Sequence, residues 1–254
     1  MASLADTAGR ISALDEYAGF DVLDTVGPGW LRLPALDVDA HLAGLVALHG
    51  RRNVAGSQFG AQLAEVVIGP TVSALVLESR CPDPAADNLA LRLAAEGHVA
   101  RVAVLSPAMA VLPDDPAAGD PRNTVLPSPE ALHGWWAARV AATLGPLLAA
   151  VRARAPFSLR HLWGGVGDDV TGTAIRIAQL AGRDAEPAWR LAERLLDALT
   201  PHLPVRPARG IPFPVPHAGG RQLFQVRGTC CLYYRSGQVV QNRSAGGPVS
   251  SSLR

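Results

Sequence analysis

The chain has 254 residues, of which 48% are hydrophobic, so it can bury a substantial core as one large domain or two small ones. Its formal net charge of +1 gives no broad positive field, and we expect no nucleic-acid partner. All basic residues other than histidine are arginines, and the absence of lysine excludes Schiff-base catalysis and a phosphate loop of the lysine-containing kind. No run of about 18 apolar residues and no signal-peptide pattern occurs, so we expect no membrane association and a cytoplasmic location.

Helices are predicted where apolar residues recur at helical spacing between capping and stop residues. In chain order these segments are residues 37–50, 51–80, 128–155 and 186–203. The first begins at Asp37 or Asp39 and ends at Gly50. The second is one long helix or two, with a break near Gly69-Pro70, and Pro146 is expected to kink or divide the third.

The remaining segments carry strand and loop signals. Valine-rich residues 98–107 predict a strand, and residues 113–123 predict a loop. Residues 158–182 indicate a glycine-rich turn that leads into another helix. Residues 204–220 indicate a proline-rich connection, and residues 221–240 a strand, a cysteine pair and a turn.

These elements predict an α+β fold that is mostly helical with a small antiparallel sheet. We expect an N-terminal half of helices and strand over residues 1–125. A C-terminal helical half over residues 126–254 then ends in the strand and the cysteine pair, the two halves forming one compact unit.

The stretch RGTCCLYYRSG, which begins at Arg227, contains the adjacent cysteines Cys230 and Cys231. Neighbouring side chains on an extended chain point to opposite faces, so these two are poorly placed to bond to each other. Cys-Cys-Leu-Tyr-Tyr-Arg followed by a glycine-containing turn resembles the C-terminal signature of the FhuF-like ferric-siderophore reductases. RRNVAGS at 51–57 resembles the family's Arg-x-x-Ala-x-Ser stretch, and RHLWGGVGDD at 160–169 resembles its Leu-Trp-Gly segment.

The resemblance covers roughly residues 50–240 and implies a FhuF-like fold. It also implies a [2Fe–2S] cluster that reduces ferric siderophores and is held by a Cys-Cys pair and a following Cys-x-x-Cys. At that later position this chain reads VVQNRSAGGP over 239–248, and no cysteine follows Cys231 in the 254 residues.

An iron–sulfur cluster takes four ligands, usually thiolates, and the cysteine pair supplies two. The residues that follow include Asn242, Arg243 and Ser244, which are poor substitutes for thiolates. A site made of Cys230, Cys231, Cys81 and His217 stays open as an alternative. The favoured interpretation is that the pair now fills space as small apolar residues. The others are a metal or cluster completed by a second chain, and a reactive thiol beside Arg227 or Arg235.

Further candidate site residues are those that can move a proton or enclose a ligand. Candidate catalytic residues are Asp168, Asp169, His133 and His161. Candidate substrate-binding residues, which include tryptophans expected to wall a cleft, are Trp135, Trp136, Trp163, Arg52, Ser57 and Tyr234. Each has a simpler interpretation: an aspartate after a turn caps a helix, a tryptophan fills the core, and a histidine or arginine faces solvent.

The predicted function is that of a FhuF-like protein without a cluster, which binds a small-molecule substrate in bacterial specialised metabolism. Its chemistry is expected to be non-redox, of the cyclisation or isomerisation type, and to need no cofactor. The alternatives are a [2Fe–2S] ferric-siderophore reductase and a non-catalytic binding protein or pathway partner. We expect a monomer or a homodimer.

Overall fold

The computed structural model describes residues 3–94, 97–217, 220–230, 232 and 235. The helices are α1 (Leu4–Leu14), α2 (Val38–His49), α3 (Arg52–Glu78), α4 (Pro129–Arg154), α5 (Leu159–Leu180) and α6 (Ala185–Leu199). Short 3-10 turns occur at Leu33–Ala35, Ala86–Asn88 and Thr200–His202. The strands are β1 (Phe20–Val22), β2 (Leu31–Arg32), β3 (Cys81–Pro82), β4 (Leu89–Leu93), β5 (Val99–Val104), β6 (Met109–Val111), β7 (Thr124–Val125), β8 (Ile211–His217) and β9 (Gly220–Val226). The predicted α+β class, mostly helical, is confirmed.

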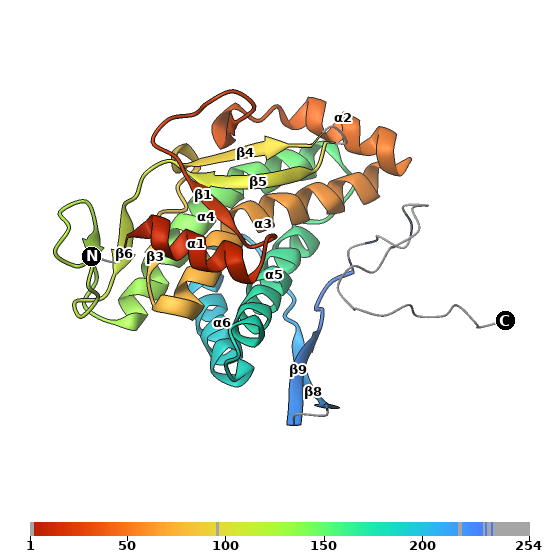
Figure 1. The fold of residues 1–254 in the computed structure, drawn as a ribbon. Coiled ribbons are helices and arrows are strands. Elements are labelled where there is room, and N and C mark those ends of the chain that lie inside the picture. Colours follow the sequence, from red (N-terminus) through yellow and green to blue (C-terminus); the bar gives the residue numbers. More distant parts are fainter. Residues whose placement is uncertain (1–2, 95–96, 218–219, 231, 233–234, 236–254) are drawn as a thin grey trace.

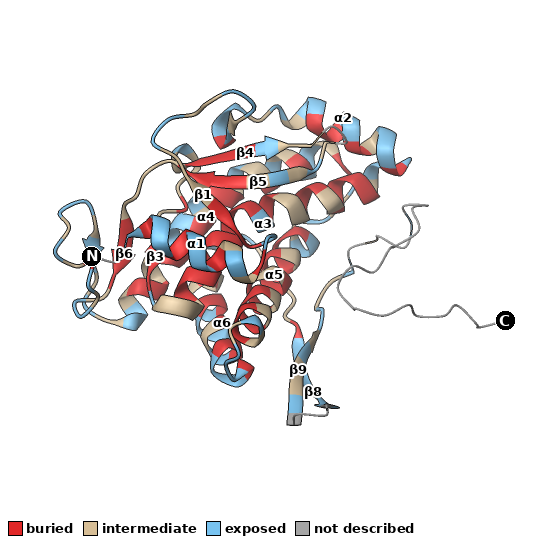
Figure 2. Ribbon diagram, in the orientation of Figure 1, coloured by how far each residue is buried: buried red, intermediate tan, exposed pale blue. Residues whose placement is uncertain are grey.

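Helix α3 lies at the centre of the molecule, with the other helices packed around it (Figure 1). It is buried on nearly every side, which is why its sequence is apolar all round (Figure 2). By length and composition α3 could cross a membrane, but 72% of its most apolar window is buried inside the protein, as in a core helix. The predicted break near Gly69-Pro70 is wrong, because α3 continues through Pro70. Helix α4 likewise continues through Pro146.

The helix ends follow the capping signals of the sequence. Asp37 caps α2 by accepting a hydrogen bond from the amide of Ala40, and Gly50 ends that helix in the left-handed conformation. Ser128 caps α4 by accepting a hydrogen bond from the amide of Ala131. Local side-chain chemistry therefore fixes where these helices begin and end.

The strands form three separate sheets. The largest has the order β1-β5-β4-β2, the second β3-β6-β7, and β8 and β9 form a hairpin. The predicted strand 98–107 is β5, and its pairing with β4 is antiparallel as expected. Two pairings, β1 with β5 and β6 with β7, are parallel and were not predicted.

The glycine-rich segment 164–167 lies inside α5 and is not a turn before it, so that prediction is wrong. Ser158 caps this helix and Gly164 follows within its second turn. A side chain at Gly164 would collide with the methyl group of Thr229, and one at Gly172 would come within 2.9 Å of the Gln225 amide nitrogen. Glycine is therefore present because the C-terminal segment lies directly against this face of α5.

The proline-rich segment 204–220 contains strand β8, where only a connection was predicted. Every second residue of this strand is a proline: Pro212, Pro214 and Pro216. The edge of β8 that lacks their N–H donors therefore faces away from β9. The apolar side chains of one hairpin face are all exposed: Ile211, Phe213, Val215, Phe224 and Val226. The hairpin projects from the body beside α5 and α6 (Figures 1 and 2).

Candidate functional site

Three of the residues predicted from the sequence meet in a shallow cavity of about 20 Å³ near the N-terminal end of α3. They are Ser57 from α3, His161 from α5 and Cys230. Thr229 and Arg227 from the C-terminal segment, with Phe157, complete the polar and aromatic part of its lining. The structure thus joins the Arg-x-x-Ala-x-Ser stretch, the Leu-Trp-Gly segment and the cysteine motif in one place.

Asp168 holds the cysteine motif against α5. Its carboxylate, 1% exposed, accepts hydrogen bonds from the amides of Gly228 (2.7 Å) and Thr229 (3.0 Å) and from the Thr229 hydroxyl (2.6 Å). The guanidinium of Arg227 lies 3.4 Å from it. The helix-capping interpretation of Asp168 is wrong, because the residue lies inside α5. Its satisfied, buried charge instead fixes the backbone that precedes Cys230.

Asp169 has a different environment on the same helix. Its side chain is half-buried, and desolvation is the main reason that its pKa is raised from 3.8 to about 7, with further increases from Glu65 and Asp168. The charges of Arg227 and Arg176 oppose this shift. A carboxyl group with such a pKa exchanges its proton near neutral pH, which suits the acid–base role that we predicted and that stays a prediction.

Cys230 is exposed, so the interpretation of this residue as a buried packing group is wrong. Cys231 and Tyr234 lie outside the described residues, and their predicted roles stay predictions. Arg227, one of the two arginines proposed to activate a thiol, is paired with Asp168. The reactive-thiol interpretation also stays a prediction.

A cluster built with remote ligands from the same chain does not fit. Cys81 follows the C-terminal end of α3, is fully buried, and has a pKa raised by burial, whereas Cys230 lies beside Gly60. Gly60 and Glu78 lie 18 residue steps apart on this helix, which corresponds to about 27 Å. His217 is also remote, because its backbone pairs with Gly220 at the hairpin tip, and β9, about 20 Å long, separates that tip from Val226.

The other donors that the described residues place near Cys230 are too few for the family's cluster. Among the described residues that line the shallow cavity, His161 supplies the one imidazole, and its Nδ1 lies 2.9 Å from the Ser158 hydroxyl. Across the described part of the chain, no group of three His, Cys, Asp or Glu residues is placed to hold a metal ion. A four-ligand iron–sulfur centre therefore does not fit the residues that one copy of this chain is shown to bring together.

The tryptophans are packing residues. Trp136 is 0% exposed, and its indole nitrogen donates a hydrogen bond to the Thr71 hydroxyl at 3.1 Å. Trp163 is 2% exposed, and Trp135 lies under the guanidinium of Arg139. The predicted tryptophan-walled cleft is therefore wrong: none of these three described residues lines the shallow cavity or the large one below.

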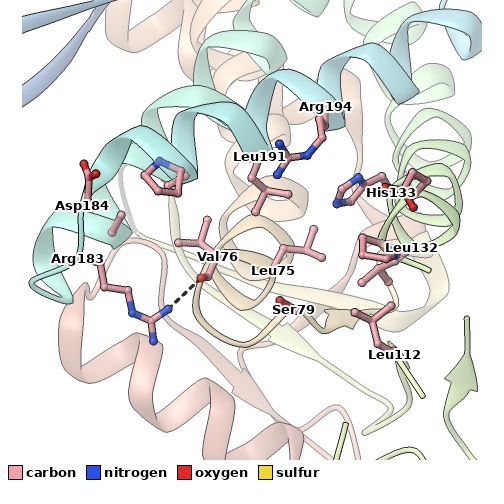
Figure 3. Close-up of a pocket in the computed structure, with 15 residues that line it drawn as sticks. Leu75, Val76, Ser79, Leu112, Leu132, His133, Arg183, Asp184, Leu191 and Arg194 are labelled. Atoms are coloured by element: carbon pink, nitrogen blue, oxygen red, sulfur yellow. Dashed lines mark hydrogen bonds between the residues drawn. The ribbon is translucent and has the colours of Figure 1, made fainter. Parts of the chain in front are cut away.

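A large cavity of about 670 Å³ lies at the other end of α3 (Figure 3). Helices α3, α4, α5 and α6 enclose it. His133 from α4 is buried and faces it, and burial lowers the pKa of this imidazole, with a further decrease from the charge of Arg194. Arg183 donates hydrogen bonds to the carbonyls of Val76 (3.1 Å) and Leu77 (3.0 Å) and so satisfies the end of α3.

The predicted catalytic residues are thus divided between two places. His133 lies in the large cavity, whereas His161, Asp168 and Asp169 lie around the cysteine motif. Arg52 lines a third cavity of about 440 Å³, between α2 and α4. Arg194 was not predicted as a site residue. The sequence predicts the amphipathic helix 186–203 that contains it, but gives no sign of the cavity that it borders.

A search of curated proteins finds no match to this chain. The family model described as ferric iron reductase FhuF-like transporter matches residues 57–223, which is more than half of the sequence. The matched range contains most of α3 and all of α4, α5 and α6, and it ends within the hairpin, before the cysteine pair. The chain therefore belongs to the FhuF-like ferric iron reductase family.

Proposed function

We propose that this FhuF-like protein works without the four-cysteine cluster of its family and handles a small organic molecule by non-redox chemistry. The observation that carries the proposal is the placement of the described thiols. Cys230 lies near one end of α3 and Cys81 is buried beyond the other, so one chain offers no four-thiolate site. A family fold can keep its framework and use another site.

The large cavity supports small-molecule binding. Its volume of about 670 Å³ lies within the range of ordinary ligand sites, and its walls are mostly apolar with a few polar groups. Such a site can hold a flexible substrate in one reactive shape and so lower the barrier to a cyclisation or isomerisation by orientation. We place this activity in bacterial specialised metabolism in the cytoplasm.

Replacing both Cys230 and Cys231 with serine tests the proposal. We expect the double variant to restore the metabolite profile of a host that lacks the gene as fully as the wild-type chain does. The reason is that the proposed chemistry uses no thiolate ligand, and Cys230 is exposed, so a serine fits at that position without new strain. The measurement is the metabolite profile by mass spectrometry, with expression of each chain checked by immunoblot.

Complementation by the wild-type chain but not by the double-serine chain would contradict the proposal. A host without the gene whose profile is unchanged would also count against it, because the protein would then convert no detectable metabolite. The control is the Asp197→Asn chain, which changes an exposed surface residue. It should restore the metabolite profile as the wild-type chain does.

A second candidate function is ferric-siderophore reduction with a cluster shared between two copies of the chain. Two observations favour it: Cys230 is exposed, and the backbone before it is held in place by Asp168. The outward apolar face of the hairpin gives a surface on which a second copy could pack. Two copies would supply four thiolates. The double-serine chain distinguishes the two candidate functions, because a reductase that shares its cluster between two copies would lose its activity when both cysteines are replaced.

A further inference from the structure

The large cavity is apolar over most of its wall, and its charged residues lie around the rim. Its apolar side chains come from segments far apart in the sequence and leave room for a hydrocarbon body. They are Leu75, Val76, Leu112, Leu132, Pro187, Ala188 and Leu191. Polar groups that fix the orientation of a ligand are few in such sites, so the charged residues at the rim decide which ligand fits.

Arg194 is the cation at this rim that remains available to a ligand. Within the described part of the chain it makes no hydrogen bond and no ion pair, although Glu130 and Asp184 also border the cavity. Arg190, one turn earlier on α6, is instead paired with Glu186 at 3.2 Å. Arg183, the other cation at the rim, is engaged with the carbonyls of α3.

His133 stands beside Arg194. Figure 3 shows its imidazole and the guanidinium of Arg194 at the same side of the cavity. His133 is 7% exposed, and within the described residues its ring nitrogens make no hydrogen bond. Burial and the nearby positive charge keep the imidazole neutral at neutral pH, so it offers one N–H donor. A neutral donor next to a guanidinium matches an anion better than a cation.

We infer that the cavity between α3 and α6 binds an apolar molecule that carries a carboxylate, with the carboxylate on Arg194 and His133 and the apolar body against Leu75 and Leu191. The guanidinium presents paired N–H donors that match a carboxylate, and the imidazole adds a third. The inference rests on the proposed small-molecule function and names its ligand class. Glu130, whose carboxylate borders the same rim, disfavours a ligand with more than one negative charge.

The test uses decanoate and its neutral analogue decanamide as probes, titrated into the full chain by calorimetry. We expect decanoate to bind the wild-type protein more tightly than decanamide. In Arg194→Gln the dissociation constant of decanoate should rise about tenfold, as expected for the loss of one charged contact, while that of decanamide stays unchanged. Arg190→Gln, which makes the same change one turn earlier on α6 at a residue that does not line the cavity, is the matched control and should leave both constants unchanged.

An unchanged decanoate affinity in Arg194→Gln would overturn the inference, and so would equal affinities of decanoate and decanamide in the wild-type chain. Equal losses in Arg190→Gln and Arg194→Gln would overturn it too, since the effect would then reflect overall charge. These outcomes are independent of the double-serine test. Decanoate binding that depends on Arg194 would stand even if the cysteines proved essential in the host.

Discussion

Replacing Asp168 with asparagine is expected to lower the free energy of unfolding by about 2–4 kcal/mol. The carboxylate is buried and accepts hydrogen bonds from two backbone amides and one hydroxyl of residues 228–229. The amide group of asparagine removes the charge and turns an N–H donor toward these donors, which leaves buried groups unsatisfied. The measurement is urea denaturation followed by circular dichroism.

Asp197→Asn is the matched control for this prediction. Asp197 is paired with Arg209 on the surface with its side chain 71% exposed, so its loss should cost less than about 1 kcal/mol. Limited trypsin digestion adds a local readout, because release of the segment should speed cleavage after Arg227 in Asp168→Asn. Equal stabilities of the two variants would show that Asp168 does not hold the cysteine motif.

Truncating Trp136 to alanine is expected to lower the free energy of unfolding by about 3–5 kcal/mol, as large-to-small changes in a packed core do. Trp136 is fully buried and its indole donates a hydrogen bond to Thr71, so the change leaves a cavity and removes the bond that the Thr71 hydroxyl accepts, although that hydroxyl still donates to the Val67 carbonyl. Trp135→Ala changes the adjacent, half-buried tryptophan and should cost about 1 kcal/mol or less. The two variants are compared by thermal and urea denaturation.

If the two neighbouring tryptophans instead walled a binding site, both variants would keep near-wild-type stability and lose ligand affinity. Stability losses of similar size in Trp135→Ala and Trp136→Ala would also contradict the structure, since it places only Trp136 in the core.

Helices were predictable where the chain carries its own capping chemistry. Asp37, Gly50 and Ser128 act locally, so the ends of α2 and α4 follow from a few neighbouring residues. The errors came from glycine and proline, whose meaning depends on distant partners. Gly164 was interpreted as a turn residue, yet it is a helical position that makes room for Thr229. Pro212 was interpreted as loop, yet its missing N–H faces the free edge of a strand.

The short strands had no readable signal. β1, β2 and β7 have two or three residues each, too few to show alternation, and their pairing is set by partners elsewhere in the chain. The N-terminal helix α1 was also not predicted, although Ser3 and Asp6 form a capping box at its start. That signal was present in the sequence.

The site could be predicted only in part. The segments that carry the family resemblance contain Ser57, His161 and Cys230, but the sequence did not show that these three residues meet in one shallow cavity. The role of Asp168 was missed because its hydrogen bonds reach residues about sixty positions later in the chain. The large cavity was missed for the same reason: Leu75 and Arg194 meet only after α3 and α6 pack together.

The iron and sulfide content of the anaerobically purified full chain, measured together with its visible spectrum, tests the central claim most directly. One copy provides the cysteine pair, with Cys81 out of reach, so we predict a colourless protein without stoichiometric iron or acid-labile sulfide. A brown protein that contains iron and sulfide, with broad visible absorption that disappears in the Cys230→Ser variant, would contradict the account. The protein would then bind an iron–sulfur cluster, as its family does.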